Sequence, residues 1–152
     1  MILEHWAYSV RLAIFFSGFF LWLGMLTGVW KYIQISQSSH GKAHYYVDIA
    51  HRSSLLYAPA TLILAVLAYF SIWSEAINLT CILINLFFFC FSILSYIVHG
   101  VLKDTTNQFK LPHQVGSISI PKTLMRVTMI SLVIGELGAT TLLCFGVFKR
   151  LF

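Results

Sequence analysis

Four long apolar runs constrain this chain more than any other feature of its sequence. They cover residues 12–30, 54–73, 77–98 and 127–148, and Glu136 is the only charged residue within them. Each run is close to the about 20 residues that a helix needs to cross a bilayer core. Charged residues make up 10% of the chain, against about 25% in typical soluble domains. The sequence therefore predicts an all-α fold, a polytopic integral membrane four-helix bundle in which residues 1–152 form one membrane domain.

Several other classes of protein fit the sequence poorly. The first run is too long for the apolar part of a signal peptide and no small-residue cleavage site follows it, so we expect a true span. The net charge is +5, but the ten basic residues are scattered at helix ends, which does not suggest nucleic-acid binding. The three cysteines lie inside apolar runs, where they indicate neither a disulfide framework nor a zinc motif.

The distribution of lysine and arginine predicts the orientation of the chain. Seven of these residues lie in the two longer connections and three lie on the opposite side with the termini and the short connection. Cytoplasmic loops carry an excess of basic residues. We therefore expect a bacterial inner membrane protein with both termini in the periplasm and lipid as its surroundings.

Small residues four positions apart mark the first and fourth spans as packing helices. Gly24 and Gly28 form a GxxxG pattern, and Ser131, Gly135 and Ala139 follow the same spacing. Such faces let helix backbones approach closely in a membrane. They serve either packing within one chain or contacts between copies, and the pattern alone leaves both open.

Polar residues before the second span suggest a site at the cytoplasmic end of the bundle. His44, Asp48 and His51 have helical spacing and share one face, and a carboxylate beside an imidazole is a common way to orient a ligating histidine. The alternative is a solvated amphipathic stretch, which we favour for His40 and His44. His51 is the stronger candidate because the apolar run begins beside it.

Histidines also follow the third span, which is the antiparallel neighbour of the second. His99 ends this span, so we expect it to approach His51 at the same membrane face. The next connection brings Asp104, Asn107 and His113 to that face, although we expect His113 to be an ordinary loop residue. Asp48 and His99 are accordingly candidate cofactor-binding residues beside His51.

One acid lies deep in the predicted bundle. Glu136 is near the middle of the fourth span, where a charge costs at least about 2.5 kcal/mol. Asn85 of the third span lies at a similar depth, and we expect it to be a partner for Glu136. The acid either serves a function or is a neutral hydrogen-bonding group that holds the helices together.

A resemblance to a known family follows from Ala50-His51 at the head of the second span and from Tyr96 near the end of the third. In these residues, and in the number and spacing of its spans, the chain resembles the styrene oxide isomerase family and related bacterial four-span membrane proteins. The resemblance implies a homo-oligomer, specifically a trimer, that binds haem b near the cytoplasmic face. His51 would be the axial ligand of the iron and Tyr96 an active-site tyrosine.

The same resemblance implies an activity. Ferric haem in this family acts as a Lewis acid that opens a small hydrophobic epoxide to an aldehyde. One position departs from the family: Tyr57 stands where an asparagine lines the substrate pocket, six residues after the ligand histidine. A phenol there would reshape the pocket or approach the iron, so Tyr57 is a further candidate catalytic residue.

Two other functions are compatible with the sequence. One is a membrane hydrolase or hydroxylase that uses zinc or iron, since His44, Asp48, His51, His99 and Glu136 are acceptable ligand types. The other is a non-enzymatic assembly or interaction subunit that packs on a larger complex through its small-residue faces.

Overall fold

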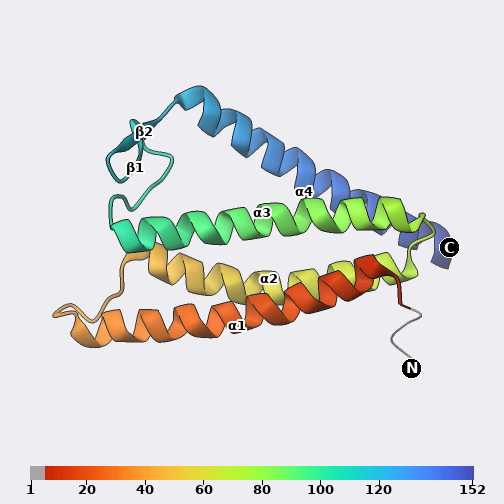
Figure 1. Ribbon diagram of the computed structural model, residues 1–152, viewed down its shortest axis with the longest axis horizontal. Helices are drawn as coiled ribbons and strands as arrows, with labels where there is room; N and C mark the ends of the chain where they lie inside the picture. The colour runs from red at the N-terminus through yellow and green to blue at the C-terminus, as the bar shows by residue number, and fades with distance from the viewer. Residues whose placement is uncertain (1–5) are drawn as a thin grey trace.

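Four helices form the bulk of the computed structural model, which describes residues 6–152. They are α1 (Tyr8–Gln37), α2 (Tyr45–Phe70), α3 (Glu75–Leu102) and α4 (Lys122–Leu151). Successive helices run in opposite directions, so the start of α1 and the end of α4 lie at the same end of the bundle as the connection between α2 and α3 (Figure 1). Each helix is long and apolar enough to cross a membrane. The predicted all-α four-helix bundle is confirmed.

Three of the helices extend beyond their apolar runs at both ends, whereas α2 begins nine residues before its run and ends at Phe70, three residues before the run does. The helix α1, for example, covers residues 8–37, whereas its apolar run covers residues 12–30. The α-helical hydrogen bonds of α1 thus continue past the ends of the apolar run, into residues that are more polar. The apolar runs therefore mark the part of each helix that matches the bilayer core.

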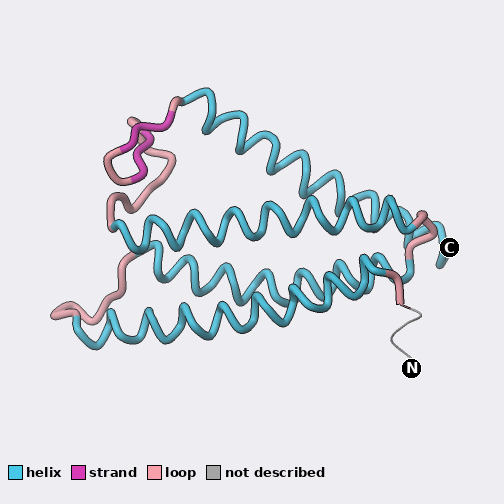
Figure 2. Tube along the Cα trace, in the orientation of Figure 1, coloured by secondary structure: helices cyan, strands magenta, loops and turns pink. Residues whose placement is uncertain are grey.

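A small β-hairpin, which was not predicted from the sequence, lies between α3 and α4. Strand β1 (His113–Val115) pairs antiparallel with β2 (Ile118–Ile120), and Val115 lies opposite Ile118. Gly116 in the turn has a φ of 58°, a left-handed conformation that glycine adopts without strain. Figure 2 shows the hairpin at the end of the bundle away from the termini.

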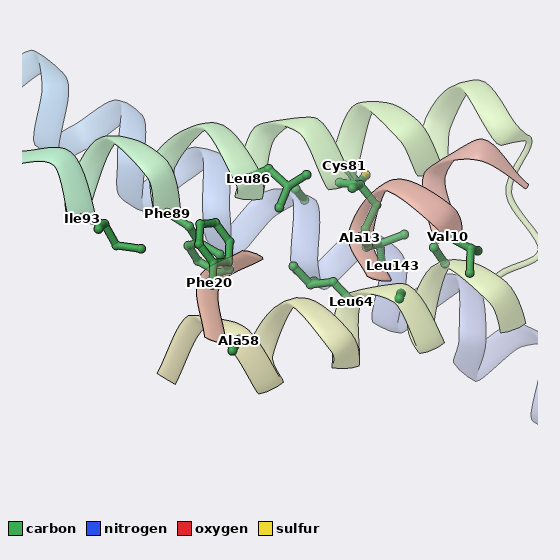
Figure 3. Packing of buried hydrophobic residues seen from close by; sticks show 14 residues of the cluster. Val10, Ala13, Phe20, Ala58, Leu64, Cys81, Leu86, Phe89, Ile93 and Leu143 are labelled. Carbon is green, nitrogen blue, oxygen red and sulfur yellow. The ribbon is translucent and has the colours of Figure 1, made fainter. Parts of the chain in front are cut away.

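The helices do not pack equally. Buried side chains of α1, α2 and α3 form most of the core, and Phe20, Ile82 and Ile93 are almost completely enclosed (Figure 3). From α4, only Ala139, Leu143 and Gly146 are buried. Figure 1 shows the reason: α4 lies against the other helices near its C-terminal end and inclines away from α3 towards the hairpin.

Close packing of α1 on α2 uses the two glycines of the GxxxG pattern. A Cβ atom at Gly24 would lie 2.6 Å from Cδ2 of Leu55, and one at Gly28 would lie 2.9 Å from Cε1 of His51. Real Cβ atoms do not approach other atoms this closely. The pattern therefore serves packing within the chain, the first of the two uses that the sequence left open for it.

Two polar contacts hold the opposite end of the bundle. The Glu75 carboxylate accepts hydrogen bonds from the backbone N–H of Ser9, at 2.7 Å, and from its hydroxyl, at 2.8 Å. The Ser9 amide belongs to the first turn of α1, where no intrahelical acceptor exists. The indole N–H of Trp73 donates to the carbonyl of Leu142 at 2.7 Å. These bonds tie α1 to α3 and the α2–α3 connection to α4.

Candidate functional site

A buried imidazole–carboxylate pair forms at the end of α3. Lys103 adopts a left-handed conformation, with a φ of 52°, and ends the helix so that the chain turns back. Nδ1 of His99 then lies 2.8 Å from Oδ1 of Asp104, and Oδ2 accepts a hydrogen bond from the Gly116 amide at 2.6 Å. The predicted convergence of Asp104 with His99 is confirmed. We call these three residues the hairpin clasp, because they hold the β-turn on α3.

Aromatic and amide groups support this end of α3. The Tyr46 ring packs on His99 with 5.0 Å between ring centroids and stacks on Tyr96 at 6.0 Å. The Tyr46 hydroxyl accepts a hydrogen bond from the Gln108 amide at 2.6 Å, and the Gln108 carbonyl lies 3.0 Å from Nδ1 of His113. His113 is thus a buried strand residue, and the prediction that it is an ordinary loop residue was wrong.

His51 lies in a different place, between α1 and α2. Its Nδ1 is 2.8 Å from the carbonyl oxygen of Gly24, and its ring lies against Gly28. A carbonyl oxygen only accepts hydrogen bonds, so we assign the ring proton to Nδ1, and Nε2 keeps its lone pair. The ring is half-buried, and no partner for Nε2 is found among residues 6–152.

The residues around His51 have other partners. The two carboxylate oxygens of Asp48 bind Nζ of Lys31 at 2.6 Å and Nη2 of Arg52 at 2.7 Å. The sequence suggested that the Asp48 carboxylate orients the His51 ring. In the structure the Gly24 carbonyl does so instead. His44 precedes α2 as its N-cap and accepts a bond from the Tyr46 amide. Burial, together with nearby Lys103, lowers the pKa of His44.

The two candidate tyrosines face the interior. The Tyr57 ring stacks on Phe89 with centroids 4.1 Å apart, and its edge meets Phe20. Six helical residues separate Tyr57 from His51, which places the two on different faces of α2. Tyr96 stacks on Tyr46, near the hairpin clasp. The structure thus brings Tyr96 close to His99, and it holds Tyr57 in the core instead of beside the His51 ring.

The intramembrane polar residues pair differently from the prediction. Asn85 donates to the Cys81 carbonyl at 3.0 Å and accepts from the Thr140 hydroxyl at 3.2 Å. No hydrogen bond joins Asn85 to Glu136 in the described residues, so the expected pairing of the two is not found. Oε1 of Glu136 is buried without a hydrogen-bond partner in the part of the chain that the structure describes.

The two candidate ligand histidines, His51 and His99, therefore belong to separate groups of residues. His51 contacts α1 and belongs to the α1–α2 interface, whereas His99 contacts Tyr46 and the connection that carries the hairpin. Within residues 6–152, no three His, Cys, Asp or Glu side chains gather as they would around a metal ion. The Gly116 turn of the hairpin clasp was missed, although its glycine and the alternating serines and isoleucines of residues 117–120 are typical of a turn and strand.

Acid is expected to loosen the hairpin through Asp104. Burial raises the pKa of Asp104, but hydrogen bonds from Gly116 and His99 outweigh this and hold the pKa below its usual value. A carboxyl with a lowered folded-state pKa stabilises the fold fully above its unfolded pKa, of about 4, and loses this contribution as pH falls through the folded value. The amide-exchange protection factor of Gly116 should therefore be constant from pH 7 to about pH 5 and fall below that.

The variant Asp104→Asn tests the origin of this pH dependence. We expect lower protection of Gly116 at pH 7 and no further loss in acid. Asp48→Asn is the matched control, because Asp48 pairs with Lys31 and Arg52 and leaves the clasp intact. Unchanged pH dependence in Asp104→Asn would show that another group, such as nearby His44, controls the hairpin.

Comparisons with protein-family models, curated proteins and solved structures give no match to this chain.

Proposed function

We propose that this chain is a haem-b-binding protein of the bacterial inner membrane, with both termini in the periplasm, in which His51 would bind the iron. The resemblance to the styrene oxide isomerase family implies that haem b is the cofactor and that His51 binds its iron. The observation that carries the proposal is the 2.8 Å contact between Nδ1 of His51 and the Gly24 carbonyl. Ligating histidines typically donate their second ring nitrogen to a carboxylate or carbonyl, which fixes the ring and directs the other nitrogen to the metal.

The surroundings of His51 support a flat, apolar cofactor with acidic groups. Gly28 leaves the ring the space that a Cβ atom would fill. Met25 and Val29 follow the two glycines by one residue each and are exposed apolar side chains. Lys31 and Arg52 add positive charge at the same end of the α1–α2 pair, which suits the propionates of haem.

A bound ferric haem supplies a Lewis acid, and the resemblance suggests isomerisation of a small hydrophobic epoxide to an aldehyde as the reaction. The residues of the chain have distinct parts in this proposal. His51 binds the cofactor and the Gly24 carbonyl orients His51. Tyr57 is packed in the core and Tyr96 lies near the hairpin clasp, so we give neither tyrosine a role beside His51. A homo-oligomer, such as a trimer, would cover the outer face of α1 and α2 and shield the cofactor from lipid.

The optical spectrum of protein purified in detergent from haem-supplemented cells tests the proposal. We expect a Soret band in the wild-type chain and at least a tenfold lower haem content in His51→Ala. His40→Ala is the control, because His40 is exposed in the α1–α2 connection. Protein that is colourless and takes up no haem on reconstitution would overturn the proposal. A band that survives His51→Ala and disappears in His99→Ala would assign the ligand to His99 and refute the role of His51.

The other two functions have less support. A zinc site needs three or four protein ligands around one ion, and no such group of side chains is found within residues 6–152. An assembly subunit was suggested by the small-residue faces. Gly24, Gly28 and Gly135 instead pack on Leu55, His51 and Phe88 of the same chain.

A further inference from the structure

A cavity of about 510 Å³ lies between α3, the hairpin and the N-terminal half of α4. It occurs where α4 inclines away from α3 (Figure 1). Pockets of about 300–1,000 Å³ are typical of small-molecule sites. His51 does not line the cavity, so it is separate from the proposed haem ligand.

The lining is mostly apolar, with a few polar groups. Apolar side chains come from all three elements, and the polar ones are Ser95, His99, Gln108 and Thr128. The apolar lining residues include Leu94, Val98, Leu124, Met125 and Met129. An apolar pocket with a small number of placed polar groups is the usual form of a site that binds and orients a small ligand.

His99 is the polar group best suited to contact a ligand. Its residue is only 3% exposed, and its Nδ1 is bonded to Asp104. Since the carboxylate of Asp104 accepts the Nδ1 proton, Nε2 is the acceptor nitrogen of the neutral ring. No hydrogen-bond partner for Nε2 is found in residues 6–152. A ligand hydroxyl that donates to Nε2 would satisfy a polar atom in an apolar setting, where a hydrogen bond is worth more than in water.

The cavity opens on the outer surface of the bundle between α3 and α4. Leu94 and Val98 of α3 and Leu124 of α4 line it and are also exposed on the surface of the bundle. These residues belong to helices long and apolar enough to cross the membrane. A ligand dissolved in lipid would therefore reach the cavity between α3 and α4 without passing through water.

We infer that this cavity binds a neutral, lipid-soluble small molecule that carries a hydroxyl group, with the apolar part against α3 and α4 and the hydroxyl donating to Nε2 of His99. The site does not depend on haem. Two features make up the proposed site. Asp104 holds the His99 imidazole in place, and the apolar cavity beside it is large enough for a small ligand.

Photolabelling in phosphatidylcholine nanodiscs tests this site. The probe is decan-1-ol that carries an aliphatic diazirine, and the labelled positions are read by mass spectrometry. We expect saturable labelling at Met125 and Met129 that excess decan-1-ol reduces at least tenfold. Excess decane, which lacks the hydroxyl, should reduce the labelling much less. Uniform labelling of lipid-facing residues that neither compound reduces would mean annular lipid only and would overturn the inference.

Two variants distinguish the contribution of the apolar cavity to ligand binding from that of the hydrogen bond to His99. Met129→Trp fills the cavity from α4 without touching the clasp, and it should abolish the saturable labelling. Ile134→Trp is its matched control, because Ile134 is an exposed residue of the same helix outside the cavity, and it should label as wild type. His99→Phe keeps an aromatic ring against Tyr46. It should bind decan-1-ol and decane equally, and continued preference for the alcohol in this variant would refute the contact with His99.

Discussion

Replacing Gly28 by leucine is expected to separate α1 from α2 and to destabilise the protein by about 2–3 kcal/mol, the usual cost of forcing a large side chain into a packed interface. The Cβ atom alone would lie 2.9 Å from the His51 ring, so the ring or the helix has to move before any leucine side chain fits. The ring must then leave the Gly24 carbonyl, which removes the contact that orients Nε2. Unfolding by titration with sodium dodecyl sulfate, followed by circular dichroism, measures the first effect.

The control for this variant is Gly18→Leu. Gly18 belongs to the same helix, and a Cβ atom there has no neighbouring atom within 4 Å. The same substitution should therefore change stability by less than about 0.5 kcal/mol, as surface substitutions usually do. Haem content gives the second readout, and we expect it to fall in Gly28→Leu and to stay unchanged in Gly18→Leu. Equal stability of the two variants would contradict the α1–α2 packing described above.

A comparable loss, about 2–3 kcal/mol, is expected when Gly146 is replaced by leucine. A Cβ atom at this position would lie 2.5 Å from Nε1 of Trp73, which donates its proton to Leu142. The new side chain would push the α2–α3 connection away from α4 at the end where α4 is best packed. The measurements are the same detergent titration and limited proteolysis, in which the released α4 should be cleaved faster.

Gly138→Leu is the matched control for Gly146→Leu. Gly138 also belongs to α4, and a Cβ atom there meets nothing within 4 Å. We expect wild-type stability and cleavage. If Gly146→Leu behaved in the same way as Gly138→Leu, α4 would not be held by the contact with Trp73.

The sequence predicted the helices well because solvation by lipid leaves a direct signal. A span needs about 20 apolar residues, and each of the four runs fulfils this requirement on its own, without knowledge of the rest of the fold. The side-chain partners of α1 were harder to predict. The spacing of Gly24 and Gly28 indicated a packing face. Which side chains pack on it depends on how α2 is oriented about its own axis, and in the structure these are Leu55 and His51.

The site was predicted less completely, and for similar reasons. Asp104 is five residues from His99, so the turn at the end of α3 was enough to bring the two together. The Gly116 amide joins them from twelve residues further along, through a hairpin whose strands have only three residues each. Asn85 was matched to Glu136 by depth alone. It pairs with Thr140 because rotation about the helix axis, which depth does not define, selects the neighbour.

The inclination of α4 makes the protein sensitive to the thickness of its membrane. The apolar run of α4, residues 127–148, would span about 33 Å if upright, slightly more than the hydrocarbon core of about 30 Å, and a helix with excess hydrophobic length adapts by tilting. Because α4 is packed near its C-terminal end and diverges from α3 at the other, its tilt changes the separation of the two helices. Thin bilayers favour the larger tilt and thick bilayers a more upright α4. Hydrophobic mismatch thus links lipid chain length to the width of the opening between α3 and α4.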